Sequence, residues 1–157
     1  MSQSLETFII CPTMMILRNQ KILLLRRTDR ASFWPNHWHC PVGKMEKGES
    51  PLKTIIRETN EELGLKVNPR FGTAVAVIGK SFHEPDLIYK NISLFFVAKE
   101  FYGEPVNKEP YLHDAMDWFD VHNLPEPIIP FVKFGIEQYL RGETYGEFGY
   151  SVGRQVN

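Results

Sequence analysis

The chain has 157 residues, of which 43% are hydrophobic, and its formal net charge at neutral pH is −1. This length and composition exclude a disordered chain and predict a single globular domain, residues 1–157, with its own core. A net charge near zero argues against bulk electrostatic binding to nucleic acid or to an anionic membrane.

No apolar run is long enough to span a bilayer, and the N-terminal residues lack the basic and apolar segments of a signal peptide. The two cysteines, Cys11 and Cys40, form no metal-type pair motif, so we expect buried free thiols. Free thiols indicate a reducing compartment, and we therefore expect a cytoplasmic protein with no membrane partner.

The first part of the chain predicts three strands. Residues 7–17 and 21–27 are rich in strand-forming residues, and the Asn19-Gln20 pair between them favours a turn, so the two segments should form a hairpin. A polar loop follows, after which the short apolar segment 38–42 predicts a third strand that runs into Gly43.

A helix is expected next. Ser50 is a good N-cap residue, Pro51 suits the first helical position, and Gly64 is a plausible stop. The apolar stripe of this helix consists of Leu52, Ile55, Ile56, Thr59 and Leu63. The far side, roughly 180–280° from the first of these residues, carries Glu58, Glu61 and Glu62. We expect the stripe to be buried and the three carboxylates to face outward.

The second half of the chain predicts more strands and one further helix. The expected elements are strands at 71–78, 87–101 and 117–121, a loop at 103–114, a helix at 130–141, and a loose tail from about residue 142. Mixed strands with two helices predict an α/β fold in which helices cover a mixed sheet.

The helix with the three carboxylates is part of a longer pattern over residues 43–65. The pattern reads Gly-x5-Glu-x7-Arg-Glu-U-x-Glu-Glu-x-Gly-U, where U is aliphatic, and its matching residues are Gly43, Glu49, Arg57, Glu58, Glu61, Glu62, Gly64 and Leu65. Thr59 replaces one aliphatic residue. This segment resembles the Nudix box. The resemblance implies a Nudix α/β/α sandwich with a central mixed β-sheet over residues 5–141.

The three helix carboxylates explain why such a segment would bind a metal. Like charges this close destabilise an exposed helix by roughly 0.2–0.5 kcal/mol per pair, whereas Mg²⁺ favours several oxygen ligands. We therefore expect Glu58, Glu61 and Glu62 to hold Mg²⁺, for which Mn²⁺ could substitute. The resemblance implies that the Gly43 carbonyl is a further metal ligand. Arg57 is expected to orient a glutamate, Glu49 in the family pattern, because its planar guanidinium suits bidentate binding of a carboxylate.

The sequence pattern identifies the general base and the substrate-binding residues less clearly than the metal ligands. Glu58, within the pattern, and Glu109, on a loop before the last strand, are both candidates for the base. Similarity to MutT-type enzymes implies that Arg27 contacts substrate. Lys44 follows the metal-binding glycine and could reach a phosphate, and Trp34 could stack on a base. The alternatives are an exposed loop acid, exposed basic side chains and a core tryptophan.

The resemblance implies a hydrolase of phosphoric anhydride bonds that acts on a small nucleotide. We expect a MutT-like pyrophosphohydrolase of (deoxy)nucleoside triphosphates. The alternatives are a hydrolase of nucleotide sugars or other nucleoside diphosphate derivatives, and a nucleotide-binding module without hydrolysis. Homodimers are common among such enzymes, so a homodimer is possible by analogy alone, and the sequence does not fix the oligomeric state. The preferred base, the bond cleaved and the choice between normal and oxidised nucleotides do not follow from these residues.

Overall fold

The computed structural model describes residues 3–81, 84 and 86–150. The main sheet has the strand order β3-β2-β1-β6-β5-β9. Strand β8 also belongs to this sheet and pairs with β2 outside that order. Its strands are β1 (Ile9–Arg18), β2 (Lys21–Arg27), β3 (Trp38–His39), β5 (Arg70–Lys80), β6 (Ile88–Ala98), β8 (His113–Asp120) and β9 (Tyr145–Phe148). The β1–β6 and β5–β9 pairs are parallel, whereas the β1–β2, β2–β8 and β5–β6 pairs are antiparallel, so the sheet is mixed as predicted.

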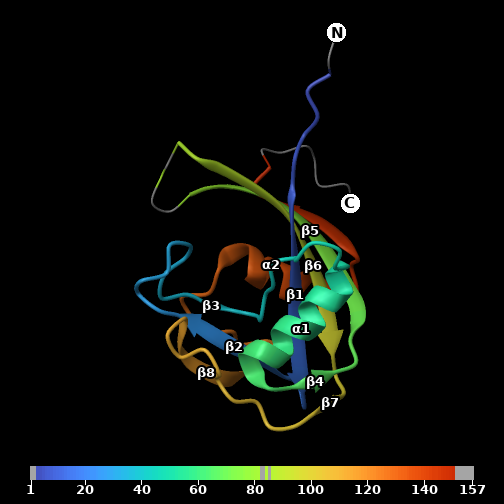
Figure 1. Cartoon of the computed structure of the whole chain (residues 1–157), viewed down its shortest axis with the longest axis vertical. Helices are drawn as coiled ribbons and strands as arrows, with labels where there is room; N and C mark the ends of the chain where they lie inside the picture. Colours follow the sequence, from blue (N-terminus) through green and yellow to red (C-terminus); the bar gives the residue numbers. More distant parts are fainter. Residues whose placement is uncertain (1–2, 82–83, 85, 151–157) are drawn as a thin grey trace.

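Two helices cover opposite faces of this sheet. Helix α1 (Pro51–Leu63) packs with Met14 and Phe96, whereas helix α2 (Pro130–Leu140) packs with Met15 and Phe95. Since neighbouring residues in a strand point to opposite faces, the two helices must lie on opposite sides. Figure 1 shows α1 lying across β1. The predicted α/β/α sandwich is confirmed.

Helix α1 begins and ends as its sequence predicts. Ser50 is extended and its Oγ accepts a hydrogen bond from the Lys53 N–H at 3.2 Å. Gly64 has φ +71°, a conformation that glycine adopts at little cost, and its N–H donates to the Asn60 carbonyl at 2.8 Å. The caps fix both ends of the helix that carries the carboxylates.

The buried face of α1 differs from the predicted stripe. Leu52 and Ile56 are 41% and 37% exposed, whereas Glu62 is only 5% exposed. Ile55, Thr59 and Leu63 are buried as expected, along with Thr54. Apolar character alone does not decide burial on this helix, because the loop before it also lies against its carboxylate side, with Gly43 beside Glu58. The expectation that all three carboxylates face outward is therefore wrong for Glu62.

Several element boundaries also differ. The single strand predicted at 87–101 ends at Ala98, and β7 (Phe101–Tyr102) pairs instead with β4 (Lys66–Val67). The expectation of a loose tail from about residue 142 is wrong for β9, which extends the main sheet by pairing with β5. Residues 151–157 of that predicted tail lie outside the described residues. Neither of the two described helices has the length and apolar character needed to cross a membrane.

Candidate active site

Arg57 joins the helix α1 to the loop before it. Its Nε donates to Glu49 Oε1 at 2.7 Å, and its Nη2 donates to Glu49 Oε2 at 3.0 Å. The Glu46 N–H and the Thr54 hydroxyl also donate to Glu49 Oε2, at 3.0 and 2.9 Å. The hydrogen bonds from Arg57, then that from the Glu46 N–H, lower the pKa of Glu49 to about 2. The predicted contact between Arg57 and Glu49 is thus present, and it ties the loop to the helix.

The same guanidinium gathers two more carboxylates. Arg57 Nη1 donates to Glu58 Oε1 and to Glu61 Oε2, both at 3.1 Å, and Nη2 donates to the Lys44 carbonyl at 3.1 Å. Hydrogen bonding to Glu49, and then to Glu58, holds the pKa of Arg57 above its ordinary value. We name Arg57 with Glu49, Glu58 and Glu61 the arginine cluster.

Gly43 lies directly against this cluster. A Cβ atom at this position would clash with Glu58 Cγ and would lie 2.9 Å from Thr54 Cγ2. The Gly43 N–H donates to the Pro12 carbonyl at 3.0 Å, which holds the loop to β1. The missing side chain therefore lets the loop backbone approach the helix beside Glu58.

Glu62 has a different environment from the arginine cluster. It is buried, and its Oε2 has no hydrogen-bond partner among the described residues. Burial raises the pKa of Glu62 well above its ordinary value, and the charges of Glu58 and Glu109 raise it further. A buried carboxylate without a partner is costly unless a proton or a cation compensates its charge. The donor set of acidic oxygens beside a glycine backbone therefore fits a hard divalent cation.

The side chains of Glu58, Glu61 and Glu62 do not form a ligand cage in this structure. Among the described residues, no three His, Cys, Asp or Glu side chains stand ready to hold a metal ion. Arg57 already occupies one oxygen each of Glu58 and Glu61. The second oxygen of each of these two carboxylates makes no hydrogen bond to Arg57.

Glu109 approaches the carboxylates from the loop between β7 and β8. Its side chain is half-buried, and the next residue back, Lys108, donates its N–H to the Glu62 carbonyl at 2.9 Å. Burial raises the pKa of Glu109, and the charges of Glu58 and Glu61 raise it further. The structure therefore brings the predicted loop candidate to the same cluster of negative charge.

Arg27, the last residue of β2, lies close enough to Glu62 for their charges to interact. Its Nε is buried without a hydrogen-bond partner in the described part of the chain, and its guanidinium lies 5.9 Å from the ring centroid of Phe33. Burial lowers the pKa of Arg27, while the charge of Glu62 opposes that shift. Arg27 is thus a cation beside the buried carboxylate, with donor capacity left over.

Sequence reasoning missed two buried histidines beside Arg27. The rings of His39 and His113 lie 5.1 Å apart, and both side chains are buried. Burial, followed by the charge of Arg27, lowers the pKa of His113 to about 4, and the same two causes lower the pKa of His39 well below its ordinary value. The alternation about Trp38 could have placed His39 on the inner face of its strand. For His113 the sequence carries no such signal, because it joins Arg27 only through the pairing of β2 with β8.

The other two predicted substrate residues lie apart from this cluster. The Lys44 side chain is exposed and makes no hydrogen bond or ion pair within the described residues, although its carbonyl binds Arg57. Trp34 has φ +49° and packs edge-on against Phe33 and His37, at the margin of the core on the α2 side. The structure therefore does not bring Trp34 to the carboxylates.

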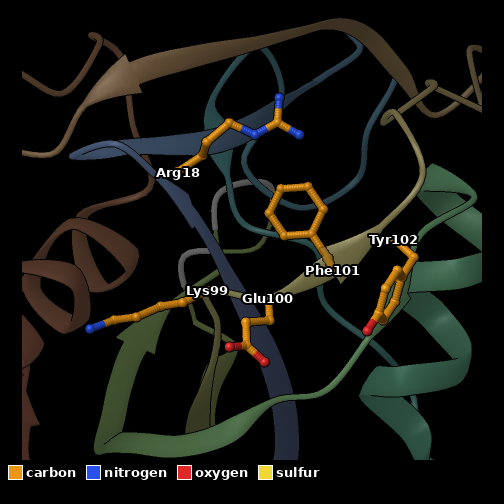
Figure 2. A pocket seen from close by; sticks show the side chains of 5 residues that line it. All are labelled: Arg18, Lys99, Glu100, Phe101 and Tyr102. Atoms are coloured by element: carbon orange, nitrogen blue, oxygen red, sulfur yellow. The ribbon is translucent and has the colours of Figure 1, made fainter.

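A surface hollow of about 440 Å³ lies elsewhere, at the end of β1 (Figure 2). It is lined by Arg18, Lys99, Glu100, Phe101 and Tyr102. The Arg18 guanidinium lies 4.9 Å from the ring centroid of Phe101 and 4.9 Å from that of Trp118. None of the predicted site residues lines this hollow, so it is separate from the carboxylate site.

The structure is an α/β/α sandwich with a cluster of carboxylates whose oxygens suit a divalent cation. In comparison with known families, residues 12–139 match the NUDIX domain. The chain therefore belongs to the Nudix hydrolase family, whose enzymes act on pyrophosphate bonds and generally use divalent metals.

Individual relatives agree with this assignment. The chain is 30% identical over 138 residues to an uncharacterized Nudix hydrolase, YvcI, of Bacillus subtilis, covering 85% of this chain and 81% of that protein. It is 32% identical over 121 residues to an RNA pyrophosphohydrolase of Agrobacterium fabrum, covering 68% and 71%. The crystal structure of a MutT NUDIX hydrolase from Burkholderia pseudomallei superposes with a TM-score of 0.74 at 28% identity, covering 85% of this chain and 98% of that one.

Proposed function

We propose that the protein hydrolyses nucleoside 5′-triphosphates with Mg²⁺, as a MutT-like pyrophosphohydrolase. The observation that carries this proposal is the buried Glu62 carboxylate, which lacks a hydrogen bond on Oε2 and lies among the charges of Glu58, Glu61 and Glu109. A hydrolase of anionic phosphates needs such a concentration of acidic oxygens to hold the cation that neutralises its substrate.

In this proposal Glu58, Glu61, Glu62 and the Gly43 carbonyl hold the metal. When bound, Mg²⁺ would neutralise phosphate charge and acidify a water molecule. Arg57 keeps Glu58 and Glu61 on one side of the helix through Nη1, while its Nε and Nη2 stay fixed on Glu49. The bidentate Glu49 contact therefore fixes the guanidinium group that holds the Glu58 and Glu61 side chains.

Glu109 is the better candidate for the general base. Glu58 Oε1 is already hydrogen-bonded to Arg57 Nη1, and Glu58 is also one of the proposed metal ligands. Glu109 has no such contact with Arg57, and burial raises its pKa. As water attacks phosphorus, a Glu109 oxygen takes one water proton, and the phosphoric anhydride P–O bond breaks. Its electron pair leaves with the departing phosphate group.

Three residues are proposed to bind substrate. Arg27 has an unused buried donor beside Glu62, which suits a phosphate oxygen. Lys44 is exposed next to Gly43 and could reach an outer phosphate. Trp34 lies on the other side of the sheet from α1, so its proposed partner is the base of the nucleotide and not the phosphates.

A second candidate substrate is the 5′-triphosphate end of RNA. It is favoured by the similarity to an RNA pyrophosphohydrolase over 71% of that protein's length. The reacting group is the same in both cases, so the carboxylate site serves both candidates. They differ in what lies beyond the first nucleotide, and a net charge of −1 offers little attraction for a long polyanion.

A substrate panel with product analysis tests the proposal. The purified protein is incubated with Mg²⁺ or Mn²⁺ and with nucleoside triphosphates, 5′-triphosphorylated RNA oligonucleotides, nucleotide sugars and ADP-ribose. The proposal expects fastest turnover of free triphosphates, with a monophosphate and pyrophosphate, or a diphosphate and phosphate, as products. Preference for a nucleotide sugar contradicts it. Tight binding without turnover on any substrate indicates a nucleotide-binding module.

A further inference from the structure

The loop between β7 and β8, residues 103–112, is docked on the C-terminal end of α1. The Val106 N–H donates to the Leu63 carbonyl at 3.0 Å, and the Lys108 N–H donates to the Glu62 carbonyl at 2.9 Å. Carbonyls in the last turn of a helix have no partner within the helix, so this loop satisfies two of them. Figure 1 shows the segment passing from β7 along the end of α1 toward β8.

One side chain within this loop ties Glu109 to the start of β8. Asn107 Oδ1 accepts a hydrogen bond from the Glu109 N–H at 3.2 Å, and Asn107 Nδ2 donates to the His113 carbonyl at 2.7 Å. The His113 N–H in turn donates to the Glu109 carbonyl at 3.0 Å. Both backbone polar groups of Glu109 are therefore held, one by Asn107 and one by the strand.

The two hydrogen bonds of Asn107 have different structural roles. An asparagine that accepts from the N–H two residues later is a common turn device and needs no functional reason. The donor bond to His113 is a second tie across the loop, which such a turn does not require. It fixes the loop to the strand that carries a buried histidine, while Lys108 fixes it to the helix that carries Glu62.

We propose that Asn107 is a positioning residue that holds the Glu109 carboxylate at the carboxylates of α1. The inference rests on the proposed function, in which Glu109 is the general base. Without Asn107 the residue at 109 keeps its side chain but loses the tie on its N–H. A displacement of about 1 Å can lower a rate by about 100-fold, so the effect should fall on the rate constant and not on substrate affinity.

The test is a double-mutant cycle of Asn107→Ala with Glu109→Gln, measured as kcat and KM on the best triphosphate substrate. Glu109→Gln should lower kcat by about 10²–10⁴-fold, as expected for loss of a general base. Asn107→Ala should lower kcat by about 10-fold or more with little change in KM. In the Glu109→Gln background the same substitution should have almost no further effect, since groups that act as a unit are not additive.

Two further variants control for a general loss of structure. Asn107→Ser keeps an acceptor for the Glu109 N–H and should recover part of the rate lost in Asn107→Ala. Asn123→Ala removes an exposed turn asparagine whose side chain makes no hydrogen bond within the described residues, and it should leave kcat unchanged. Thermal unfolding of each variant shows whether the fold is intact.

Amide hydrogen exchange tests the positioning contact without any turnover. In Asn107→Ala the Glu109 N–H should exchange at least about 10-fold faster, while the amides of α1 stay protected. Unchanged exchange at Glu109 overturns the proposal, as does equal loss of kcat from Asn107→Ala in both backgrounds. Full activity of Glu109→Gln overturns both this inference and the role proposed for Glu109. Faster exchange in a protein without turnover supports the contact and places the failure in the proposed function.

Discussion

The carboxylates of the site fall into two regions that differ in how their charge is compensated. In the arginine cluster, Glu49, Glu58 and Glu61 all accept hydrogen bonds from Arg57. In the second region, Glu62 and Glu109 have no hydrogen bond from Arg57, and their pKa values are raised by burial. The first region therefore stabilises the loop and helix as they stand. The second contains carboxylates whose negative charge is stabilised by a bound cation or a proton. We expect water activation to take place in this second region.

Removing the buried charge should have the largest effect on catalysis. Glu62→Gln keeps the shape of the side chain but removes a proposed metal ligand, and it should lower kcat/KM by about 10³-fold or more. The same substitution removes a buried carboxylate that has no hydrogen bond on Oε2, so the metal-free protein should become more stable at neutral pH. Steady-state rates and the urea unfolding midpoint measure the two effects. Loss of both activity and stability would contradict the distinction between the two regions.

Breaking the arginine cluster should reduce activity and stability together. Arg57→Ala releases Glu49, Glu58 and Glu61 at once, and we expect a loss of about 100-fold in kcat together with a lower unfolding midpoint. Arg141→Ala is the matched control, because Arg141 also binds a glutamate through its guanidinium, at an exposed position outside the site. If both variants behave alike, the arginine cluster has no special role.

A side chain at Gly43 should act through its neighbour on the helix. Gly43→Ala places a methyl group against Glu58, and overpacking of this kind destabilises proteins by about 1–3 kcal/mol. Displacement of the Glu58 side chain should also lower the rate of hydrolysis by about 10-fold or more. Gly48→Ala is the comparison, since Gly48 has φ +86° but open space around it, so it should cost backbone strain and little activity. Equal activities of the two variants would count against a tight approach at Gly43.

The smallest effect concerns the buried histidines beside the second region. The folded-state pKa of His113 is lowered to about 4 from an ordinary value of 6.5, so between these values the unfolded chain binds more protons. Stability contributed by the neutral imidazole is therefore present above about pH 6.5 and is lost as the pH falls toward 4. His39 acts in the same direction.

His113→Gln should flatten the decline of the unfolding free energy with falling pH by up to about 1.4 kcal/mol per pH unit, the limit for one proton. Chemical denaturation measured from pH 7.5 to 4.5 follows this slope. His122→Gln, the substitution of an exposed histidine, is the control. An unchanged slope in the His113 variant would show that this imidazole does not titrate in the predicted window.

The arginine cluster could be predicted from the sequence because its members are close together along the chain. Glu49 and Arg57 are eight residues apart, the helix caps at Ser50 and Gly64 place Arg57 on the helix, and the family pattern implies its pairing with Glu49. The burial of Glu62 could not be predicted in the same way. The apolar stripe predicts an outward-facing carboxylate, but Glu62 is buried, and the loop between β7 and β8 contacts its backbone through Lys108.

Pairing between strands that are distant in the sequence explains the remaining differences between the predicted and the observed structure. Arg27 meets His113 because β2 and β8 are neighbours in the sheet, although 86 residues separate the two. The Gly-rich, polar sequence from residue 142 onward favours a loose tail, and only its pairing with β5 makes β9 a strand. Sequence patterns describe local geometry well, but they do not show which distant strand completes a site.

Direct metal binding gives the sharpest test of the two-region arrangement. Mn²⁺ binding to the substrate-free protein is measured by calorimetric titration for the native sequence, for Glu62→Gln and for Glu100→Gln, an exposed control outside the carboxylate site. Glu62→Gln should weaken binding at least about 10-fold, while Glu100→Gln should bind like the native sequence. Equal affinity of all three proteins for Mn²⁺ would contradict the assignment of the buried Glu62 carboxylate as the centre of the metal site.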